Sequence, residues 1–194
     1  MDIQELIDRG FAVKEYPKDK IVYQPGALPR YVYFIKTGEI RMVTVSDDGK
    51  EFIQGIFKAG QYFGEPALIV DRRYLAFTIA NKDSEIISVS KRDFFNLIEN
   101  TPGFSTNLIQ KLSNRLFYKS MMLEELANEK AEHRLLTIIN YLLCDIEIGD
   151  SLKVTRQELA DMTGLRVETV IRETKLLSEK GLIQTKKGKI VRFR

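Results

Sequence analysis

The side chains with the clearest capacity for chemistry lie in residues 154–177, VTRQELADMTGLRVETVIRETKLL. Glu168, Arg172 and Lys175 recur at intervals of four and three residues, so they share the exposed face of a helix expected from about Val167 to Glu179. A carboxylate and a guanidinium on one exposed helix face can form hydrogen bonds with the edges of base pairs. The spacing therefore favours recognition of nucleic acid.

A second, shorter helix is expected just before this one. Thr155 followed three residues later by Glu158 is a capping-box pattern, and the helix should end near Met162. Gly164 then permits a tight turn, because a residue without Cβ turns sharply at little cost. A short helix, a glycine turn and a second helix is the helix-turn-helix arrangement, although an ordinary helical hairpin has the same pattern.

The last residues, GLIQTKKGKIVRFR, add a basic hairpin to this motif. Two apolar pairs flank the turn at residues 186–189, which predicts a short hairpin. A helix-turn-helix closed by such a hairpin is a winged helix, and the cations of the wing would lie near phosphate. Residues 151–194 carry a net charge of +6, whereas residues 1–150 carry −3. This asymmetry is typical of nucleic-acid contact, and a solvated basic face is the alternative.

The counts of reactive residues argue against an enzyme or a metalloprotein. The chain has one histidine, His133, and one cysteine, Cys144, which cannot build a His or Cys metal cluster. We find no phosphate-binding loop, nucleophile elbow or dinucleotide fingerprint. We therefore expect no catalytic residues, no metal and no cofactor, with Cys144 buried as a small apolar residue and His133 exposed on a helix.

The same composition bears on location. A single cysteine excludes an internal disulfide and fits a reducing cytoplasm. No apolar run approaches the roughly 18–20 residues of a membrane span, and the charged N-terminus, MDIQELIDRG, lacks the apolar core of a signal peptide. We expect a cytoplasmic protein without membrane contact.

Residues 16–89 contain many short β-rich runs separated by turns, which predicts an all-β sandwich or barrel. Short helices at residues 2–9 and 91–99 should flank it, and Asp47-Asp48-Gly49 is a hairpin signal. The predicted strands are KIVYQ, YVYFI, EIRMVTVS, EFIQGIF, LAFTIA and EIISVS.

A long helix is expected over residues 104–128, between the β region and the helix-turn-helix. Its apolar residues recur at spacings of about three and four, with Ser120 in one place of the stripe. This pattern favours a dimeric coiled coil, and the alternative is a helix that packs on its own β domain. The predicted seam consists of Ile109, Leu112, Leu116, Leu123 and Leu126.

The order of these elements resembles the CRP/FNR family of bacterial transcription regulators. The resemblance covers nearly the whole chain and rests on three patterns: TRQELADMTGL-x-VETV-x-R, Pro25-Gly26…Tyr33-x-Ile35-x-x-Gly38, and Gly60-x-x-x-Gly64-Glu65. It implies an α+β fold with a cyclic-nucleotide-binding-like, double-stranded jelly-roll-like β-roll at residues 1–103. A dimerisation helix at 104–128 and a winged helix-turn-helix at 129–194 would follow.

The resemblance also implies partners: double-stranded DNA at palindromic sites, RNA polymerase and a second copy of the chain. Family members read a TGA core with a Glu and an Arg four residues apart, which match Glu168 and Arg172, and Val167 looks more like the FNR branch. Glu173 and Thr174 stand where the family packs two apolar residues, which could change the angle of this helix. The expected DNA-contacting residues are Thr155, Arg156, Gln157, Arg166, Val167, Glu168, Thr169, Arg172, Lys187 and Lys189.

An effector pocket is implied as well, but its phosphate-binding residues differ. In cyclic-AMP-responsive members a Gly-Glu pair and a later Arg-Ser-Ala run hold the ribose and phosphate. Here Tyr74 and Leu75 replace the arginine and serine, and tyrosine cannot supply a charged bidentate fork. We therefore expect an effector other than cyclic AMP, in a pocket with apolar Leu68, Leu75 and Phe77 nearby. The implied pocket residues are Gly64, Glu65, Arg72, Arg73, Tyr74, Leu75 and Ser120.

The expected mechanism is a population shift, in which an effector in the β-roll biases the helix dimer and sets two recognition helices about 34 Å apart. Four alternatives compete with this interpretation. One is a constitutive regulator with a vestigial pocket. Another is a cyclic-AMP sensor in which Arg72 or Arg73 takes over the phosphate. A third is a nucleotide-binding interaction module without DNA function. The last is a cupin-like metalloenzyme, which would need several histidines that the β region lacks.

Overall fold

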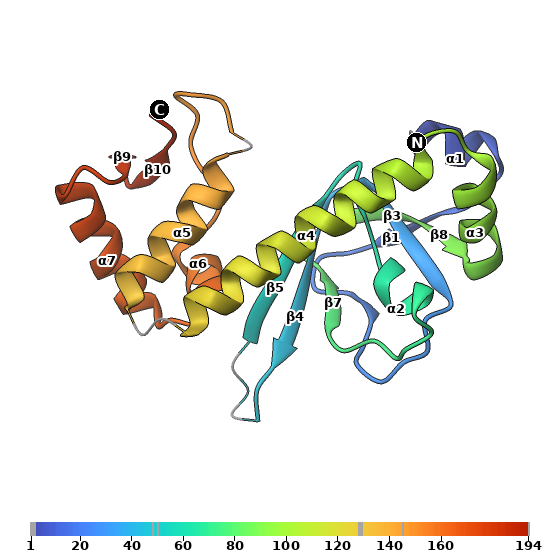
Figure 1. Ribbon diagram of the computed structural model, residues 1–194, viewed down its shortest axis with the longest axis horizontal. Coiled ribbons are helices and arrows are strands. Elements are labelled where there is room, and N and C mark those ends of the chain that lie inside the picture. Colours follow the sequence, from blue (N-terminus) through green and yellow to red (C-terminus); the bar gives the residue numbers. More distant parts are fainter. Residues whose placement is uncertain (1–2, 48, 50, 128–129, 145, 194) are drawn as a thin grey trace. The chain divides into compact units, whose positions relative to one another are not determined.

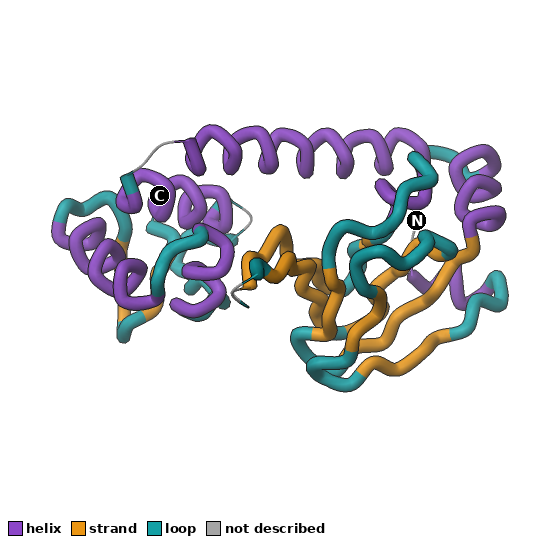
Figure 2. Tube along the Cα trace, turned by 90° about the horizontal axis from the view of Figure 1, so that it is seen from below, coloured by secondary structure: helices purple, strands orange, loops and turns teal. Residues whose placement is uncertain are grey.

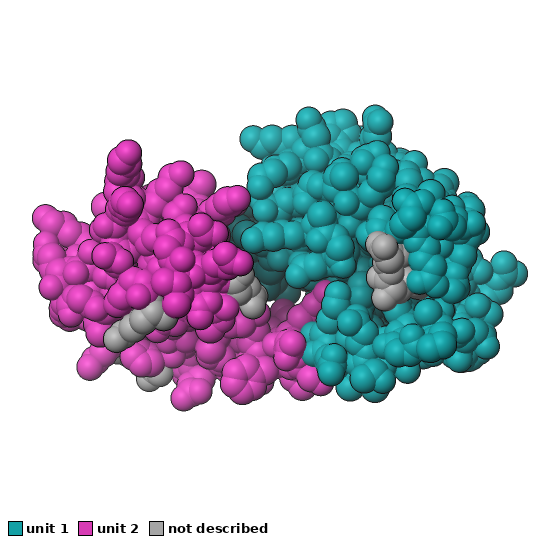
Figure 3. All heavy atoms as spheres, turned by 90° about the horizontal axis from the view of Figure 1, so that it is seen from above, with its two compact units in different colours: residues 1–112 teal, residues 113–194 magenta. Residues whose placement is uncertain are grey.

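A computed structural model describes residues 3–47, 49, 51–127, 130–144 and 146–193. The chain divides into two compact units, residues 1–112 and 113–194 (Figure 3). The first unit contains two four-stranded antiparallel sheets and the second is mainly helical (Figures 1 and 2). The helix α4, Phe104–Ala127, contributes residues to both units.

The strand order of the first sheet is β1-β8-β3-β6 and that of the second is β2-β7-β4-β5. Short alternating strands and turn residues produce this architecture, and the α+β fold with an N-terminal β domain is confirmed. The strands are β1 Val13–Tyr16, β2 Ile21–Tyr23, β3 Tyr31–Thr37, β4 Glu39–Val45, β5 Glu51–Lys58, β6 Tyr62–Phe63, β7 Phe77–Ala80 and β8 Ser84–Ser90.

Each predicted β run contains a strand, whereas β1 and β6, which have four and two residues, were not predicted. The predicted hairpin joins β4 to β5, with Val45 opposite Glu51, while Asp48 of its turn lies outside the described residues.

The side chains of β3 alternate between two cores. Tyr33 and Ile35 point between the sheets, where they pack with aromatic residues of both. Val32 and Phe34 point to the opposite face, which is covered by α1 (Ile3–Asp8), α3 (Lys91–Asn100) and the first two turns of α4. The period-two alternation of a strand accounts for this division. One strand thereby anchors both the β-roll interior and the start of the long helix.

The second unit combines the end of α4 with α5 (Ala131–Leu143), α6 (Arg156–Thr163), α7 (Val167–Glu179) and the hairpin of β9 (Gln184–Lys186) and β10 (Lys189–Val191). The predicted recognition helix agrees with α7 at both ends, and α6 ends one residue later than predicted. A helix at α5 was not singled out from the sequence. The core of this unit includes Leu135, Ile138, Ile139, Leu159, Met162, Val170, Leu177, Ile183 and Ile190.

The expectation for Cys144 is wrong, because this residue is exposed. Cys144 is the C-cap of α5, one position beyond the buried Leu143, and one helical step turns it away from the core. His133 is exposed, as predicted. Among the described residues, no helix has the length and apolar character needed to cross a membrane. The same residues contain no group of three or more His, Cys, Asp or Glu side chains arranged to hold a metal ion.

Candidate nucleic-acid interface and effector pocket

The start of α6 is fixed by a complete capping box. Thr155 Oγ1 accepts a hydrogen bond from the Glu158 amide at 3.0 Å, and Glu158 Oε2 accepts one from the Thr155 amide at 2.7 Å. Gly164 ends the helix in the left-handed conformation, with φ 69°, and the Leu165 amide donates to Ala160 O at 3.0 Å. The residues from which the turn was predicted, Thr155, Glu158 and Gly164, thus fix the two ends of α6. The end of α6 in turn determines where α7 begins.

The two faces of α7 differ as the periodicity predicts. Val170 and Leu177 are completely buried, whereas Glu168, Arg172 and Lys175 are exposed. Arg166, the N-cap of α7, is exposed as well, while Val167 and Thr169 are half-buried.

Glu173 and Thr174 occupy the buried side of α7 and are 7% and 3% exposed. Each has a local partner that makes its burial tolerable. Thr174 Oγ1 donates to Val170 O at 2.6 Å, and Glu173 accepts hydrogen bonds from Arg172. The effect of these residues on the angle of α7 stays a prediction.

The wing is tied to the first residue of α6. Arg156 Nη2 donates to Gly188 O in the turn between β9 and β10 at 3.0 Å, beside a cavity of about 140 Å³. Burial lowers the pKa of the Arg156 guanidinium from its usual value, although arginine stays charged at neutral pH. Lys187 in this turn and Lys189 at the start of β10 are exposed. Gln157 is also exposed, and its Nε2 donates to Asp161 Oδ1 at 2.8 Å.

A polar network that sequence reasoning missed connects α4 with α5 and α6. Glu125, only 5% exposed, accepts hydrogen bonds from Thr137 Oγ1 at 3.0 Å and lies 2.7 Å from His133 Nδ1. Arg134 donates from Nε to Glu125 O and from Nη1 to Thr163 O, both at 3.2 Å. The charged segment EKAEHR does not indicate these contacts, because the partners of His133 and Arg134 lie up to 29 residues away in the chain.

Most of the apolar stripe of α4 is exposed to solvent. Ile109, Leu116 and Leu123 are 64%, 67% and 71% exposed, and Ser120 is exposed too. Leu112 differs, because it packs partly buried against the helix-covered core of the first unit. The side chain of Leu126 lies outside the described part of the chain. The first turns of α4 thus pack on the β-roll, and the later part of α4 exposes an apolar stripe.

The interior of the β-roll is filled with aromatic side chains. Tyr74 is 4% exposed and stacks on Tyr23, with ring centroids 3.6 Å apart and planes at 8°. Its hydroxyl donates to Tyr31 O at 3.1 Å, and burial raises its pKa. Burial raises the pKa of Tyr33 to about 12. Both hydroxyls therefore stay protonated at neutral pH and offer no charge to an anion.

Gly64 and Glu65 lie at the edge of this interior. Gly64 has φ 91° and caps α2 (Glu65–Ile69), and a Cβ there would come within 3.2 Å of the Tyr33 ring. Glu65 is completely buried. Its proximity contributes to the raised pKa of Tyr74. The ionisable group buried near Tyr74 is therefore an acid and not a base.

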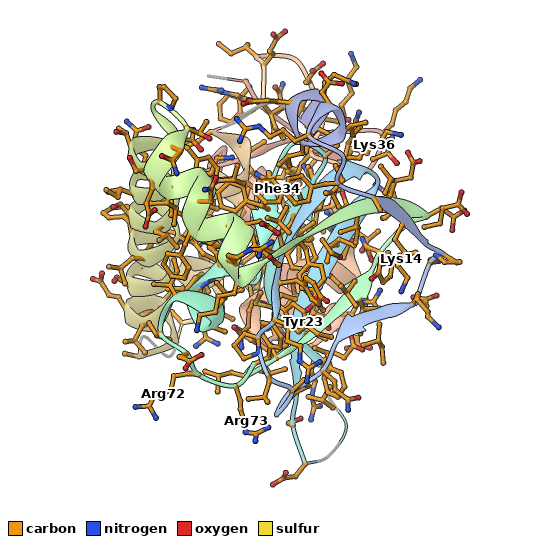
Figure 4. The ribbon with its side chains drawn as sticks, turned by 90° about the vertical axis from the view of Figure 1, so that its right-hand side faces the viewer. Lys14, Tyr23, Phe34, Lys36, Arg72 and Arg73 are labelled. Carbon is orange, nitrogen blue, oxygen red and sulfur yellow. The ribbon has the colours of Figure 1, made fainter. Side chains whose placement is uncertain are left out.

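The arginines of the expected pocket lie outside this interior. Arg72 and Arg73 are exposed, and Figure 4 shows the guanidinium of Arg72 turned outward. Arg73 Nη1 donates to Gly26 O at 2.6 Å. In the part of the chain that the structure describes, no lysine or arginine is buried. The aromatic interior therefore holds no cation for a phosphate.

Two apolar residues expected near the pocket lie elsewhere. Leu75 is 85% exposed, whereas its neighbour Tyr74 is 4% exposed. Leu68 is buried in the helix-covered core on the other face of the first sheet. Phe77 is half-buried on β7.

Two domain models match the chain in succession. The cyclic nucleotide-binding domain matches residues 13–101, and the Crp-like helix-turn-helix domain matches residues 133–193. A β-roll of the first kind followed by a DNA-binding motif of the second defines a class of transcription regulators that couple a sensor domain to a DNA reader.

Known relatives agree with this class. The chain is 27% identical over 180 residues to the cyclic AMP receptor protein of Thermus thermophilus, covering 93% of this chain and 83% of the relative. It is 27% identical over 188 residues to the global nitrogen regulator of a Nostoc species, with 92% and 83% covered. A CooA mutant from Carboxydothermus hydrogenoformans has the same fold, with a TM-score of 0.83, 22% identity, and 100% and 88% of the chains covered. The chain belongs to the CRP/FNR family of transcription regulators.

Proposed function

We propose that this regulator acts as a homodimer that reads palindromic sites with a TGA core through α7. The observation that carries the proposal is the exposure of Glu168 and Arg172 on the face of α7 opposite its buried row. Arg172 would donate to guanine O6 and N7, and Glu168 would accept from cytosine N4. Thr155, Arg156, Gln157, Arg166, Thr169, Lys187 and Lys189 would contact or flank the phosphates and bases.

The proposed dimer forms through the stripe of α4. Ile109, Leu116 and Leu123 are the support for it, because three large apolar side chains on one helix face are unfavourable in water. Leu112 lies in the same stripe and would contribute its exposed part. Pairing of two copies would place two recognition helices about 34 Å apart, one turn of DNA. RNA polymerase is the proposed second macromolecular partner, as for other members of the family.

The experiment that tests this proposal is selection of binding sites from random duplex DNA by the full chain, followed by light scattering of the free protein. We expect enriched sites to be two-fold symmetric and the protein to be a dimer. Enrichment of asymmetric or unrelated sequences would contradict the proposed readout. A monomer would contradict the proposed interface.

We propose further that cyclic AMP is not the effector. The support is electrostatic: the interior beside Tyr74 contains buried Glu65, and the nearby arginines face solvent. A phosphate transferred there from water would lose hydration without gaining a cation. A constitutive regulator is the second candidate, favoured by the stack of Tyr74 on Tyr23, which closes the interior without a ligand. Footprinting in the presence and absence of cell extract metabolites would separate a constitutive protein from one that needs an effector.

A further inference from the structure

Glu173 is a charged residue in the row of α7 that packs inward. The other members of this buried row are Val170, Thr174 and Leu177. α7 packs against both α5 and α6. A carboxylate in such a place is unfavourable unless it is paired and hydrogen-bonded. The partner of Glu173 therefore bears on why a charged residue is accommodated at this position.

That partner is the adjacent Arg172. Its Nε and Nη2 both donate to Glu173 Oε1, at 3.1 Å and 2.9 Å. The side chain of Arg172 is 68% exposed, whereas that of Glu173 is 10% exposed. The guanidinium thus lies at the boundary between the buried row and the exposed face that carries Glu168. The carboxylate of Glu173 is therefore held inside the domain, and the guanidinium of Arg172 faces solvent.

The contact leaves part of the guanidinium available. Arginine has five N–H groups in a planar fork, and the Nε–H and one Nη2–H point to Glu173. One Nη1 proton and the second Nη2 proton share the outer edge of the guanidinium, which does not face Glu173. Nη1 and Nη2 can therefore donate together to O6 and N7 of one guanine. Glu173 therefore holds the arginine without occupying the edge that would read a base.

We infer that Glu173 is a specificity-determining residue that holds Arg172 in its base-reading orientation. The inference rests on the proposed function, in which α7 reads DNA. An arginine held by a buried carboxylate loses less freedom when it binds a base and is less able to swing to a phosphate. The carboxylate also offsets the arginine charge, which weakens attraction to DNA of any sequence. Both effects increase the ratio of specific to non-specific affinity.

The test compares Glu173→Leu and Glu173→Gln with the wild-type full chain by fluorescence anisotropy. Three duplexes are needed: the selected palindrome, the same palindrome changed at the base pair where Arg172→Ala abolishes discrimination, and a random sequence. We expect Glu173→Leu to reduce discrimination at that base pair by about fivefold or more and to increase affinity for the random duplex. Glu173→Gln keeps an acceptor but loses the charge, so its loss should be smaller.

Glu179→Gln is the matched control, because it removes one negative charge from α7 without contacting Arg172. It should increase affinity for all three duplexes by similar factors and leave discrimination unchanged. Circular dichroism and thermal unfolding verify that each variant is folded. If Glu173→Leu is unfolded, Glu173→Gln, which preserves the shape of the side chain, decides the question.

Two outcomes would overturn the inference. Discrimination unchanged within twofold in both Glu173 variants means that the carboxylate does not position Arg172. Increased discrimination means that it competes with the base for the guanidinium. In either case a wild-type preference that depends on Arg172 leaves the proposed function intact. A wild-type protein without any preferred sequence refutes both the proposed function and this inference.

Discussion

Arg134 donates a hydrogen bond from Nη1 to the backbone oxygen of Thr163, the last residue of α6, at 3.2 Å. The same guanidinium donates from Nε to the backbone oxygen of Glu125, near the end of α4. One side chain therefore joins the long helix to the helix that precedes the Gly164 turn. Its contact with Thr163 lies directly before the Gly164 turn that leads to α7.

Arg134→Ala should destabilise the second unit, because two backbone carbonyls lose a charged donor. We expect a cost of about 1–3 kcal/mol in the free energy of unfolding and weaker DNA binding. Urea unfolding and anisotropy measure the two effects. Arg92→Ala, at a side chain that is 92% exposed, should change stability by no more than about 0.5 kcal/mol. Equal stability of the two variants would show that the link contributes nothing.

Substitutions in α7 should affect sequence-specific DNA binding, whereas substitutions in the wing should affect binding to DNA of any sequence. Glu168→Ala and Arg172→Ala should each lose about 1–3 kcal/mol on a TGA-containing palindrome and little on random DNA. Lys187→Ala and Lys189→Ala should weaken both complexes alike and reduce the dependence of affinity on salt. Anisotropy titrations at several salt concentrations measure both. Retained preference in Arg172→Ala would refute direct readout.

Leu116→Glu should yield monomers, since two carboxylates would meet at the two-fold axis of the proposed dimer. The cost is several kcal/mol, enough to abolish pairing at micromolar concentrations. Light scattering measures the mass. Asn114→Glu, on the exposed opposite side of α4, is the control and should stay dimeric. Leu112→Glu is less suitable, because this side chain also packs on the β-roll. A dimeric Leu116→Glu protein would place the interface elsewhere.

Cyclic AMP should bind no more tightly than about 100 µM, or about −5.5 kcal/mol, in calorimetric titrations. The reason is that no lysine or arginine among the described residues is buried beside Tyr74. Micromolar binding that disappears in Arg73→Ala would contradict this prediction, because it would mean that Arg73 leaves Gly26 and takes the phosphate. Arg72→Ala is the control for a general loss of positive charge in the same loop.

The buried tyrosines predict a loss of stability at high pH. The pKa of Tyr33 is about 12 in the folded protein, against 10.0 ordinarily, so the unfolded chain releases this proton first. Stability from this group is fully present below pH 10 and is lost as the pH rises from 10 to 12. Urea midpoints across this range should fall less steeply for Tyr33→Phe than for the wild type. Identical slopes would assign the loss to other groups.

Local signals made the DNA-reading motif predictable. Thr155, Glu158 and Gly164 act on neighbours within a few residues, so the ends of α6 and α7 follow from the sequence to within one residue. The position of Leu75 was not predictable in the same way. An apolar residue beside a pocket motif suggests burial, but the inward turn of Tyr74 and its stack on Tyr23, far away in the chain, decide the outcome.

The partners of Glu125 and the packing of Leu112 were missed for a similar reason. A stripe at helical spacing indicates which residues share a face of α4, yet the pattern does not tell where the β-roll ends beneath it. A single acidic residue among others gives no sign that His133 and Thr137 of the next helix will enclose it. Contacts between elements decide both cases.

The bond from Arg156 to Gly188 makes the start of α6 and the tip of the wing parts of one body. If both ends contact phosphates, as we propose, this bond would restrain the distance between them. A duplex whose phosphates are spaced differently would then have to change its own shape to fit the protein. Sequences that bend easily, such as those with pyrimidine–purine steps, would gain affinity at base pairs that no side chain touches.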